Sequence, residues 1–364
     1  MSVPAVKAAA LVDRKPPVHM RIDELRVNYR VAAGYLKAVD GVSLEVRPGE
    51  TIGLVGESGC GKSTVAKAIL RLLPEDARVE GRILLDGEDV LRMSNKELRR
   101  IRWTKLAFIT QSAMNSLDPV YRIGDQIVES ILAHENVGKE QAWRRAEELF
   151  TLVGIKPARL KDYPHQFSGG MRQRAVIAMA LSLNAGLLLA DEPTTALDSI
   201  MQDQVLARIR RLQEELSRSM ILVTHDMAVV AETCQTLAVM YAGKIIETGP
   251  VADVLTNPFH PYTMGLRNAF PRIDDERRQL ISIPGNLPSL LDPPRGCRFA
   301  SRCPFRTERC TREEPALLKV GERQFSACHY PDQAGEFRAR AEERRTWDRV
   351  DPMLRAASAA GGGP

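Results

Sequence analysis

Short apolar runs separated by amphipathic segments dominate the first 255 residues. Residues 51–57, 187–191 and 221–226 are almost entirely apolar and end in glycine or in polar side chains. Strands that are buried on both faces of a parallel sheet have this composition. Helical patterns alternate with them, over 63–73, 123–153, 171–183 and 200–216. Further strands joined by turns are expected over 21–55 and 82–90, so the pattern predicts an α/β fold.

The texture changes after Gly249, where prolines become frequent and regular elements are expected to be short. A boundary near residue 255 follows, and the end of the chain is charged and then rich in Ala and Gly. We therefore predict four parts: an N-terminal tail (1–19), an α/β domain (20–255), a Pro-rich domain (256–335) and a charged helix with a flexible tail (336–364).

Composition narrows the class of protein. The 364 residues are 44% hydrophobic and 27% charged, with a net charge of +5, which does not demand a nucleic-acid partner. The first residues lack the long apolar core of a secretory signal, and no run reaches the ~18 apolar residues that span a bilayer. We expect a cytosolic chain whose thiols stay reduced.

Residues 56–63 (GESGCGKS) match the phosphate-binding pattern G-x-x-x-x-G-K-[ST], between an apolar strand and a helix. Glycines let consecutive N–H groups converge on phosphate oxygens at the positive end of the helix. Lys62 is expected to reach the β- and γ-phosphates, and the Ser63 hydroxyl to ligate Mg²⁺. Cys60 is read as a small residue of the loop, not as a nucleophile. The other predicted nucleotide contacts of this segment are Gly56, Ser58, Gly59, Gly61 and Thr64.

Two acids end the apolar run 187–191, at Asp191 and Glu192. Asp191 is positioned to hold Mg²⁺, and Glu192 to orient and deprotonate an attacking water. A second glycine-rich helix start lies upstream, where Ser168 is a good N-cap and Gly169 and Gly170 expose backbone N–H groups. It is a second potential anion site, without a lysine of its own.

Together these segments resemble the ATP-binding cassette ATPases over roughly residues 20–255. Tyr29 fits the aromatic residue that stacks on adenine, Gln111 the Q-loop, Asp198 the D-loop and His225 the switch histidine. FSGGM fits the family signature, with Met171 where many members have Gln. The resemblance implies a P-loop NTPase fold with a RecA-like core, an antiparallel β subdomain and a helical subdomain.

The resemblance also implies roles and a dimer. Catalytic residues would be Glu192, His225, Gln111 and Lys62, and Mg²⁺ ligands would be Ser63, Gln111 and Asp191. Two cassettes face head to tail in this family, so Ser168, Gly169 and Gly170 of one would clasp ATP held by the other. The chain is therefore expected to contribute a competent ATPase site.

Four cysteines, Cys297, Cys303, Cys310 and Cys328, gather in the Pro-rich domain. Disulfides are improbable in a cytosolic chain, which leaves a metal site or coincidence. Tight C-x-x-C knuckles typical of structural zinc are absent, and four thiolates at this looser spacing suit a [4Fe–4S] cluster better. Zinc and small unligated core residues remain the alternatives, and His329 is read as a neighbour of the site.

NPFHPYT at 257–263, followed by these cysteines, resembles the C-terminal extension of the dipeptide/oligopeptide permease ATPase subunits. The resemblance supports the cluster and implies a peripheral protein on the cytoplasmic face of the membrane. Its partners would be a second, related ATPase subunit (a heterodimer), two membrane-spanning permease subunits and an extracytoplasmic solute-binding protein. The Q-loop segment 110–119 departs from the usual peptide-importer sequence, so oligosaccharides or nickel stay open as alternative solutes.

The sequence thus predicts an ATPase that energises import of a peptide-like solute. The alternative from another class is a soluble cassette ATPase in nucleic-acid repair or translation, but tandem cassettes, long coiled coils and strongly basic arms are absent. Residues 1–255 carry 33 basic and 32 acidic residues, whereas the rest carries 18 and 14. The excess centres on six arginines among the cysteines, which would offset thiolate charge or form a solvated basic face. They are Arg295, Arg298, Arg302, Arg306, Arg309 and Arg312.

Overall fold

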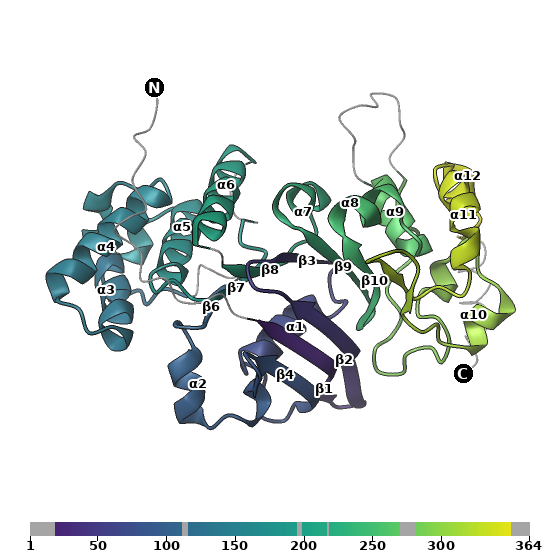
Figure 1. Cartoon of the computed structure of the whole chain (residues 1–364), viewed down its shortest axis with the longest axis horizontal. Helices are drawn as coiled ribbons and strands as arrows, with labels where there is room; N and C mark the ends of the chain where they lie inside the picture. Colours follow the sequence, from purple (N-terminus) through teal and green to yellow (C-terminus); the bar gives the residue numbers. More distant parts are fainter. Residues whose placement is uncertain (1–18, 111–115, 195–198, 217, 270–280, 351–364) are drawn as a thin grey trace. The chain divides into compact units, whose positions relative to one another are not determined.

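The structure is a computed structural model that describes residues 19–110, 116–194, 199–216, 218–269 and 281–350 (Figure 1). The chain divides into two compact units. Unit 1 comprises residues 1–21, 45–51 and 83–223, and unit 2 comprises 22–44, 52–82 and 224–364. Each unit is described by itself. The predicted tail 1–19 lies almost wholly outside the described residues.

Unit 1 contains three parallel strands flanked by helices. The strands β6 (Leu106–Ile109), β7 (Leu187–Asp191) and β8 (Ser219–Val223) pair in the order β6-β7-β8. Every residue of β7 and β8 is buried, which explains their continuous apolar runs. The helices are α2 (Asn95–Ile101), α3 (Ile123–His134), α4 (Lys139–Leu152), α5 (Gly169–Ala180) and α6 (Ser199–Leu216).

The predicted helical segment 123–153 is two helices, α3 and α4. Gly138 precedes α4, and the backbone of residues 135–138 is not helical. Each helix buries one face: α3 buries Ile127 and Ile131, and α4 buries Ala146 and Phe150. The two helices pack against each other, so the predicted segment forms a helical hairpin (Figure 1).

Unit 2 holds a mixed sheet and a second, antiparallel ribbon. Its mixed sheet runs β3-β9-β10-β12-β11, with β3 parallel to β9 and the following pairs antiparallel. The strands are β3 (Thr51–Val55), β9 (Thr236–Tyr241), β10 (Lys244–Pro250), β11 (Leu318–Lys319) and β12 (Phe325–Ser326). In the ribbon β2 (Gly34–Val46) neighbours β1 (Met20–Val31), which neighbours β4 (Arg78–Leu85); the end of β4 pairs with β5 (Glu88–Asp89) in unit 1. The parallel strands confirm the α/β fold class.

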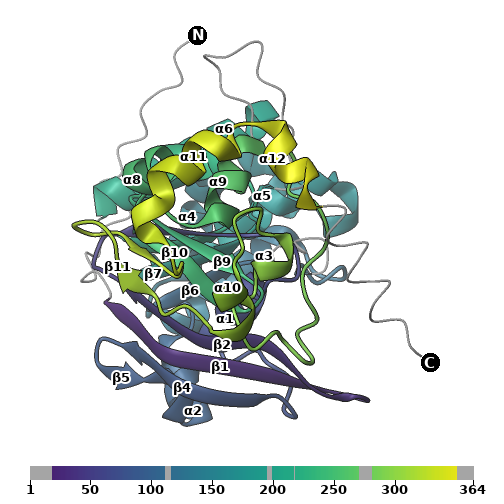
Figure 2. The same ribbon diagram turned by 90° about the vertical axis from the view of Figure 1, so that its right-hand side faces the viewer.

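The helices of unit 2 begin with the short α1 (Lys62–Ile69), which ends earlier than the predicted 73 because Arg71 adopts a φ of 50°. The others are α7 (Met227–Thr233), α8 (Val251–Thr256), α9 (Pro261–Ala269), α10 (Glu308–Arg312), α11 (Ala334–Ala341) and α12 (Arg344–Asp348). Helix α11 lies beside α9 (Figure 2). The predicted C-terminal helix is therefore two short helices over its described part.

Glu247 on β10 organises the start of the Pro-rich region. Its buried carboxylate accepts hydrogen bonds from Phe259 N (2.7 Å), His260 N (2.9 Å) and Gln324 Nε2 (2.9 Å). His260 is also buried, and its Nδ1 accepts from Tyr262 N (3.1 Å). Residues 257–263 are thus fixed to the sheet of unit 2 by one carboxylate, which explains why a Pro-rich segment is ordered there.

Candidate nucleotide-binding site

The phosphate-binding loop joins β3 to α1 in unit 2. Gly56, Gly59 and Gly61 have φ angles of 152°, 82° and 109°, and Gly61 is the N-cap of α1. A Cβ on Gly56 would lie 2.1 Å from Met240 O, and one on Gly61 would lie 2.3 Å from Ala38 O. Two of these glycines are therefore required by packing as well as by backbone conformation.

Lys62 is the first residue of α1 and is buried. Its Nζ donates to the carbonyls of Gly56 (2.7 Å) and Glu57 (2.9 Å), within its own loop. A phosphate oxygen can replace these carbonyls as acceptor, because the ammonium group prefers an anionic partner. The lysine is thus held at the start of the helix, where the dipole also favours an anion.

Tyr29 and Thr64 meet beside this loop. Tyr29 Oη donates to Thr64 Oγ1 over 3.3 Å, so β1 presents its aromatic ring near the start of α1. Ser63, between Lys62 and Thr64, is half-buried. The Cys60 thiol is buried, and burial raises its pKa, which agrees with the reading of Cys60 as a small, unreactive residue.

The predicted switch histidine, His225, lies near the phosphate-binding loop in unit 2. Its neighbour Thr224 donates its backbone N–H to the carbonyl of Leu54 (3.3 Å), and Leu54 is two residues before Gly56, the first residue of the loop. His225 is exposed, and Asp226 caps α7 by accepting from Ala228 N (2.9 Å) and Val229 N (3.3 Å). The capped helix fixes the backbone on the far side of the histidine.

In unit 1, Asp191 ends β7 with only 4% of its surface exposed, and Glu192 follows with a φ of 46°. Glu192 N donates to Val223 O (2.8 Å), which holds the turn at the end of β8. Gln173 Nε2, buried on α5, donates to Pro193 O (2.5 Å). Gln173 was not predicted as a site residue, although a glutamine on the buried face of a helix was a signal for this contact.

The signature segment of unit 1 is open. Ser168 is the N-cap of α5, where its Oγ accepts from Met171 N (3.3 Å), and its side chain is exposed. A Cβ added at Gly169 would meet nothing within 4 Å. The predicted residues Ser168, Gly169 and Gly170 thus start a helix, with free space beside Gly169. Gln111 and Asp198 lie outside the described residues.

The four cysteines of unit 2 approach one another. Cys297 N donates to Cys310 O (2.8 Å), and burial, reinforced by the neighbouring thiols, raises the pKa of Cys297 to about 12 and of Cys328 to about 11. Burial and the same neighbours also raise the pKa of Cys303. Among the described residues, however, no group of three or more His, Cys, Asp or Glu side chains is arranged to hold a metal ion. The predicted [4Fe–4S] site is therefore not supported as a formed site.

Four of the six arginines pair with carboxylates. Arg298 and Arg302 are buried: Arg298 pairs with Asp40 on β2 and with the Ala242 carbonyl, and Arg302 pairs with Glu57. Arg309 and Arg312 are exposed and pair with acids of their own helical segment, Glu313 and Glu308. Four of the six arginines thus pair with carboxylates, and the expectation that they also offset thiolate charge stays a prediction.

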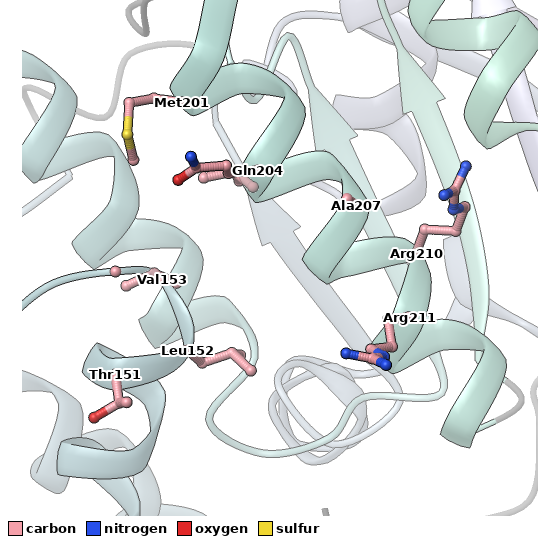
Figure 3. A pocket seen from close by; sticks show the side chains of 10 residues that line it. Thr151, Leu152, Val153, Met201, Gln204, Ala207, Arg210 and Arg211 are labelled. Carbon is pink, nitrogen blue, oxygen red and sulfur yellow. The ribbon is translucent and has the colours of Figure 1, made fainter. Parts of the chain in front are cut away.

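A cavity of about 660 Å³ lies in unit 1, between the end of α4 and α6 (Figure 3). Thr151, Leu152 and Val153 line one side, and Met201 and Gln204 are among the residues of α6 that line the other. None of the sequence-predicted site residues lines it. The nucleotide site is therefore assigned from the motifs and not from this cavity.

The glycine-rich loop of unit 2, which holds a lysine at a helix start, and the paired acids and open Ser-Gly-Gly helix cap of unit 1 are the features expected of an ATP-binding cassette ATPase. The ABC transporter family model matches residues 39–195, and the model of the oligopeptide/dipeptide transporter C-terminal region matches residues 246–310. No helix in the described part of the chain is long and apolar enough to cross a membrane.

The chain is similar along most of its length to the dipeptide transport ATP-binding protein DppD of Bacillus subtilis, with 44% identity over 87% of this chain and 96% of that protein. It is 40% identical to the oligopeptide transport ATP-binding protein OppD of Escherichia coli, over 91% of this chain and 98% of that protein. The dimeric ATP-binding cassette MJ0796, solved with ADP and Pi, matches 64% of this chain and 98% of its own with a TM-score of 0.59 and 27% identity. The chain belongs to the ATP-binding subunits of the dipeptide and oligopeptide ABC transporters, and it is an ATPase.

Proposed function

We propose that this chain hydrolyses ATP to energise the import of dipeptides or oligopeptides. The observation that carries the proposal is the similarity of nearly the whole chain, including the region after residue 246, to peptide-transport ATP-binding proteins. The ABC transporter family model matches residues 39–195 alone. The added C-terminal region is the feature that favours a peptide importer over other cassette ATPases.

For the nucleotide site, we infer that Lys62 and the amides of Gly56, Ser58, Gly59, Gly61 and Thr64 bind the phosphates. The ring of Tyr29 would stack on adenine, which its hydrogen bond to Thr64 beside the loop supports. Glu192 would be the general base and His225 would contact the γ-phosphate. Mg²⁺ would be held by Ser63, Asp191 and Gln111, and would neutralise charge on the transferred phosphoryl group. Hydroxyl, carboxylate and amide oxygens are the donors that Mg²⁺ prefers, so this set fits the ion in kind.

A dimer would complete each site. The exposed Ser168 and the open space beside Gly169 support a role in which the signature and Asp198 bind a nucleotide held by a second ATPase subunit. The similar cassette MJ0796 is dimeric with ADP and Pi. The second subunit is proposed to be a related chain, which gives a heterodimer.

Docking to membrane subunits is supported by two exposed side chains at the start of the helical hairpin. Val120 is 71% exposed and Tyr121 is 59% exposed, in the turn that leads to α3. Exposed apolar side chains next to each other on a surface are typical of protein contacts. We propose that they face two permease subunits at the cytoplasmic side of the membrane, with an extracytoplasmic binding protein selecting the solute. No nucleic acid is needed.

We also propose the four-part division of the chain, with the ATPase domain ending near residue 255.

We further propose that the four cysteines hold a [4Fe–4S] cluster, with zinc as the alternative. Four thiols that approach one another are the right donors in kind, although their arrangement here does not form a metal site. When bound, such a cluster would stabilise a region with little apolar core. Anaerobically purified protein is expected to contain iron and acid-labile sulfide, and zinc alone or no metal would refute the cluster.

The function is tested by affinity purification of the full chain from its own membranes, followed by peptide-uptake assays in cells that lack it. Co-purified permease subunits and a loss of peptide uptake are expected. If oligosaccharide or nickel uptake is lost while peptide uptake is intact, the transported solute is an oligosaccharide or nickel and not a peptide. ATPase activity stimulated by nucleic acid, with no membrane partner, would overturn the importer in favour of a repair or translation factor.

A further inference from the structure

The second residue of the phosphate-binding loop, Glu57, is held by the C-terminal region through both its backbone and its side chain. Glu57 N donates to Tyr262 Oη (3.0 Å), and its carboxylate pairs with Arg302 Nη1 (2.8 Å). The carbonyl of the same residue accepts from Lys62 Nζ (2.9 Å). One residue of the loop therefore joins the phosphate-binding lysine to two side chains that lie more than 200 residues further along the chain.

Arg302 is a built anchor and not a surface arginine. Its side chain is 2% exposed, and its other donors reach Pro284 O (2.7 Å), Ile283 O (3.3 Å) and Tyr241 Oη (3.2 Å). Each of the three guanidinium nitrogens thus donates to an acceptor in the C-terminal region or on β9. The pair with Glu57 has the rigid, charge-assisted geometry that positions a partner well.

Tyr262 belongs to a cluster of aromatic side chains that also lies next to Arg302. The ring centroids of Tyr262 and Tyr241 are 4.7 Å apart, and Phe299 packs edge-on against both, at 5.4 Å and 5.2 Å. Tyr262 is on α9, Tyr241 ends β9, and Phe299 directly precedes the turn that carries Arg302. Such a cluster has few alternative packings, so the two groups that contact Glu57 are held as one unit.

We propose that Arg302 and Tyr262 are positioning residues of the phosphate-binding loop, through which the C-terminal region sets the affinity of the chain for ATP. The inference rests on the proposed nucleotide-binding role of the loop. Glu57 lies between Gly56 and Ser58, whose amides would face the phosphates, and its carbonyl holds Lys62 within the loop until a phosphate oxygen replaces it. If Glu57 is released, the loop loses the fixed curvature that nucleotide binding needs, and small displacements of binding groups are costly.

The test is a double-mutant cycle on the full-length chain, with a fluorescent ATP analogue and Mg²⁺ as the probe. Arg302→Met and Glu57→Gln are each expected to weaken binding about 10-fold, the size of one lost charge-assisted hydrogen bond. The double variant is expected to lose about 10-fold as well, and not about 100-fold, because both changes abolish the same ion pair. The KM for ATP should rise by the same factor with little change in kcat.

Arg338→Met is the matched control. Arg338 anchors another C-terminal carbonyl, Pro258 O (3.0 Å), and stacks on Phe259, without contact to the loop. It should lower the melting temperature and leave ATP affinity unchanged. An equal loss of ATP affinity in Arg338→Met would show a general effect of C-terminal stability and overturn the proposal.

Arg302→Met leaves the carbonyls of Pro284 and Ile283 without this donor, so it can fail to fold. Tyr262→Phe removes only the hydroxyl that accepts from Glu57 N, and Glu57→Gln changes a half-buried side chain. Unchanged ATP affinity in both of these variants overturns the proposal. If Lys62→Ala also binds the analogue normally, the proposed nucleotide site fails too, whereas loss of binding in Lys62→Ala confines the failure to Arg302 and Tyr262.

Discussion

Two glycine-rich helix starts, the phosphate-binding loop before α1 and the signature before α5, look alike in sequence and differ in construction. In the loop, the glycines adopt positive φ angles against backbone carbonyls, and a buried lysine points into the loop. At the signature, Ser168 caps an ordinary helix and Gly169 faces open space. The loop is built to hold an anion by itself, whereas the signature has the form of a surface that binds what another subunit presents.

The largest expected effect is on ATP turnover, which is proposed to need both the loop and the signature. Glu192→Gln removes the proposed general base and is expected to lower ATP turnover about 10³-fold, within the range for such a group. ATP binding should persist, so ATP should accumulate in a dimer with its signature engaged. Single-turnover kinetics and size-exclusion chromatography measure this. Turnover equal to that of the unchanged protein would refute the base assignment.

Substitutions in the loop and in the signature are expected to differ in their effect on ATP affinity, beginning with Lys62→Ala. It removes a charge-assisted contact to phosphate and is expected to weaken ATP binding about 100-fold. Ser168→Ala should leave the affinity of the isolated chain unchanged, because the signature would bind only the partner's nucleotide. Equilibrium binding to the isolated chain distinguishes them. An equal loss of affinity in Ser168→Ala would mean that the signature contributes to its own chain's site.

The motif segments could be predicted from sequence because they are local. The glycine spacing of 56–63 and the buried runs of β7 and β8 each specify one element, and the structure confirms those elements. The break between α3 and α4 was missed because both halves of the segment carry apolar residues at helical spacing and no proline separates them. The pairing of Arg302 with Glu57 spans 245 residues and depends on the tertiary fold, so no local pattern reveals it.

Glycine substitutions compare the two regions by stability. Gly61→Ala places a Cβ 2.3 Å from Ala38 O at a φ of 109°, so it is expected to cost about 3 kcal/mol of stability. Gly169→Ala adds a methyl group in open space at the start of a helix and is expected to change stability by less than about 0.5 kcal/mol. Chemical denaturation measures both. A large loss for Gly169→Ala would mean that the signature is packed as tightly as the loop.

A last prediction concerns the packing around Tyr262, where the buried groups Glu247 and His260 lie at the start of the C-terminal region. Burial raises the pKa of Glu247 to about 7, so its contribution to stability is present at low pH and lost as the pH rises from about 4.5 to 7. Burial lowers the pKa of His260 to about 3, so its contribution is present above pH 6.5 and lost as the pH falls toward 3. Between pH 4.5 and 6.5 the two slopes oppose each other.

Stability of the unchanged protein should therefore vary little with pH in that window. In Glu247→Gln only the His260 slope remains, so the free energy of unfolding should rise by up to ~1.4 kcal/mol per pH unit from 4.5 to 6.5. Melting temperatures measured at intervals of half a pH unit reveal the slope, with His260→Gln as the control of opposite sign. If melting temperature depends on pH in the same way in all three proteins, the titration of Glu247 and His260 does not determine the stability of this region.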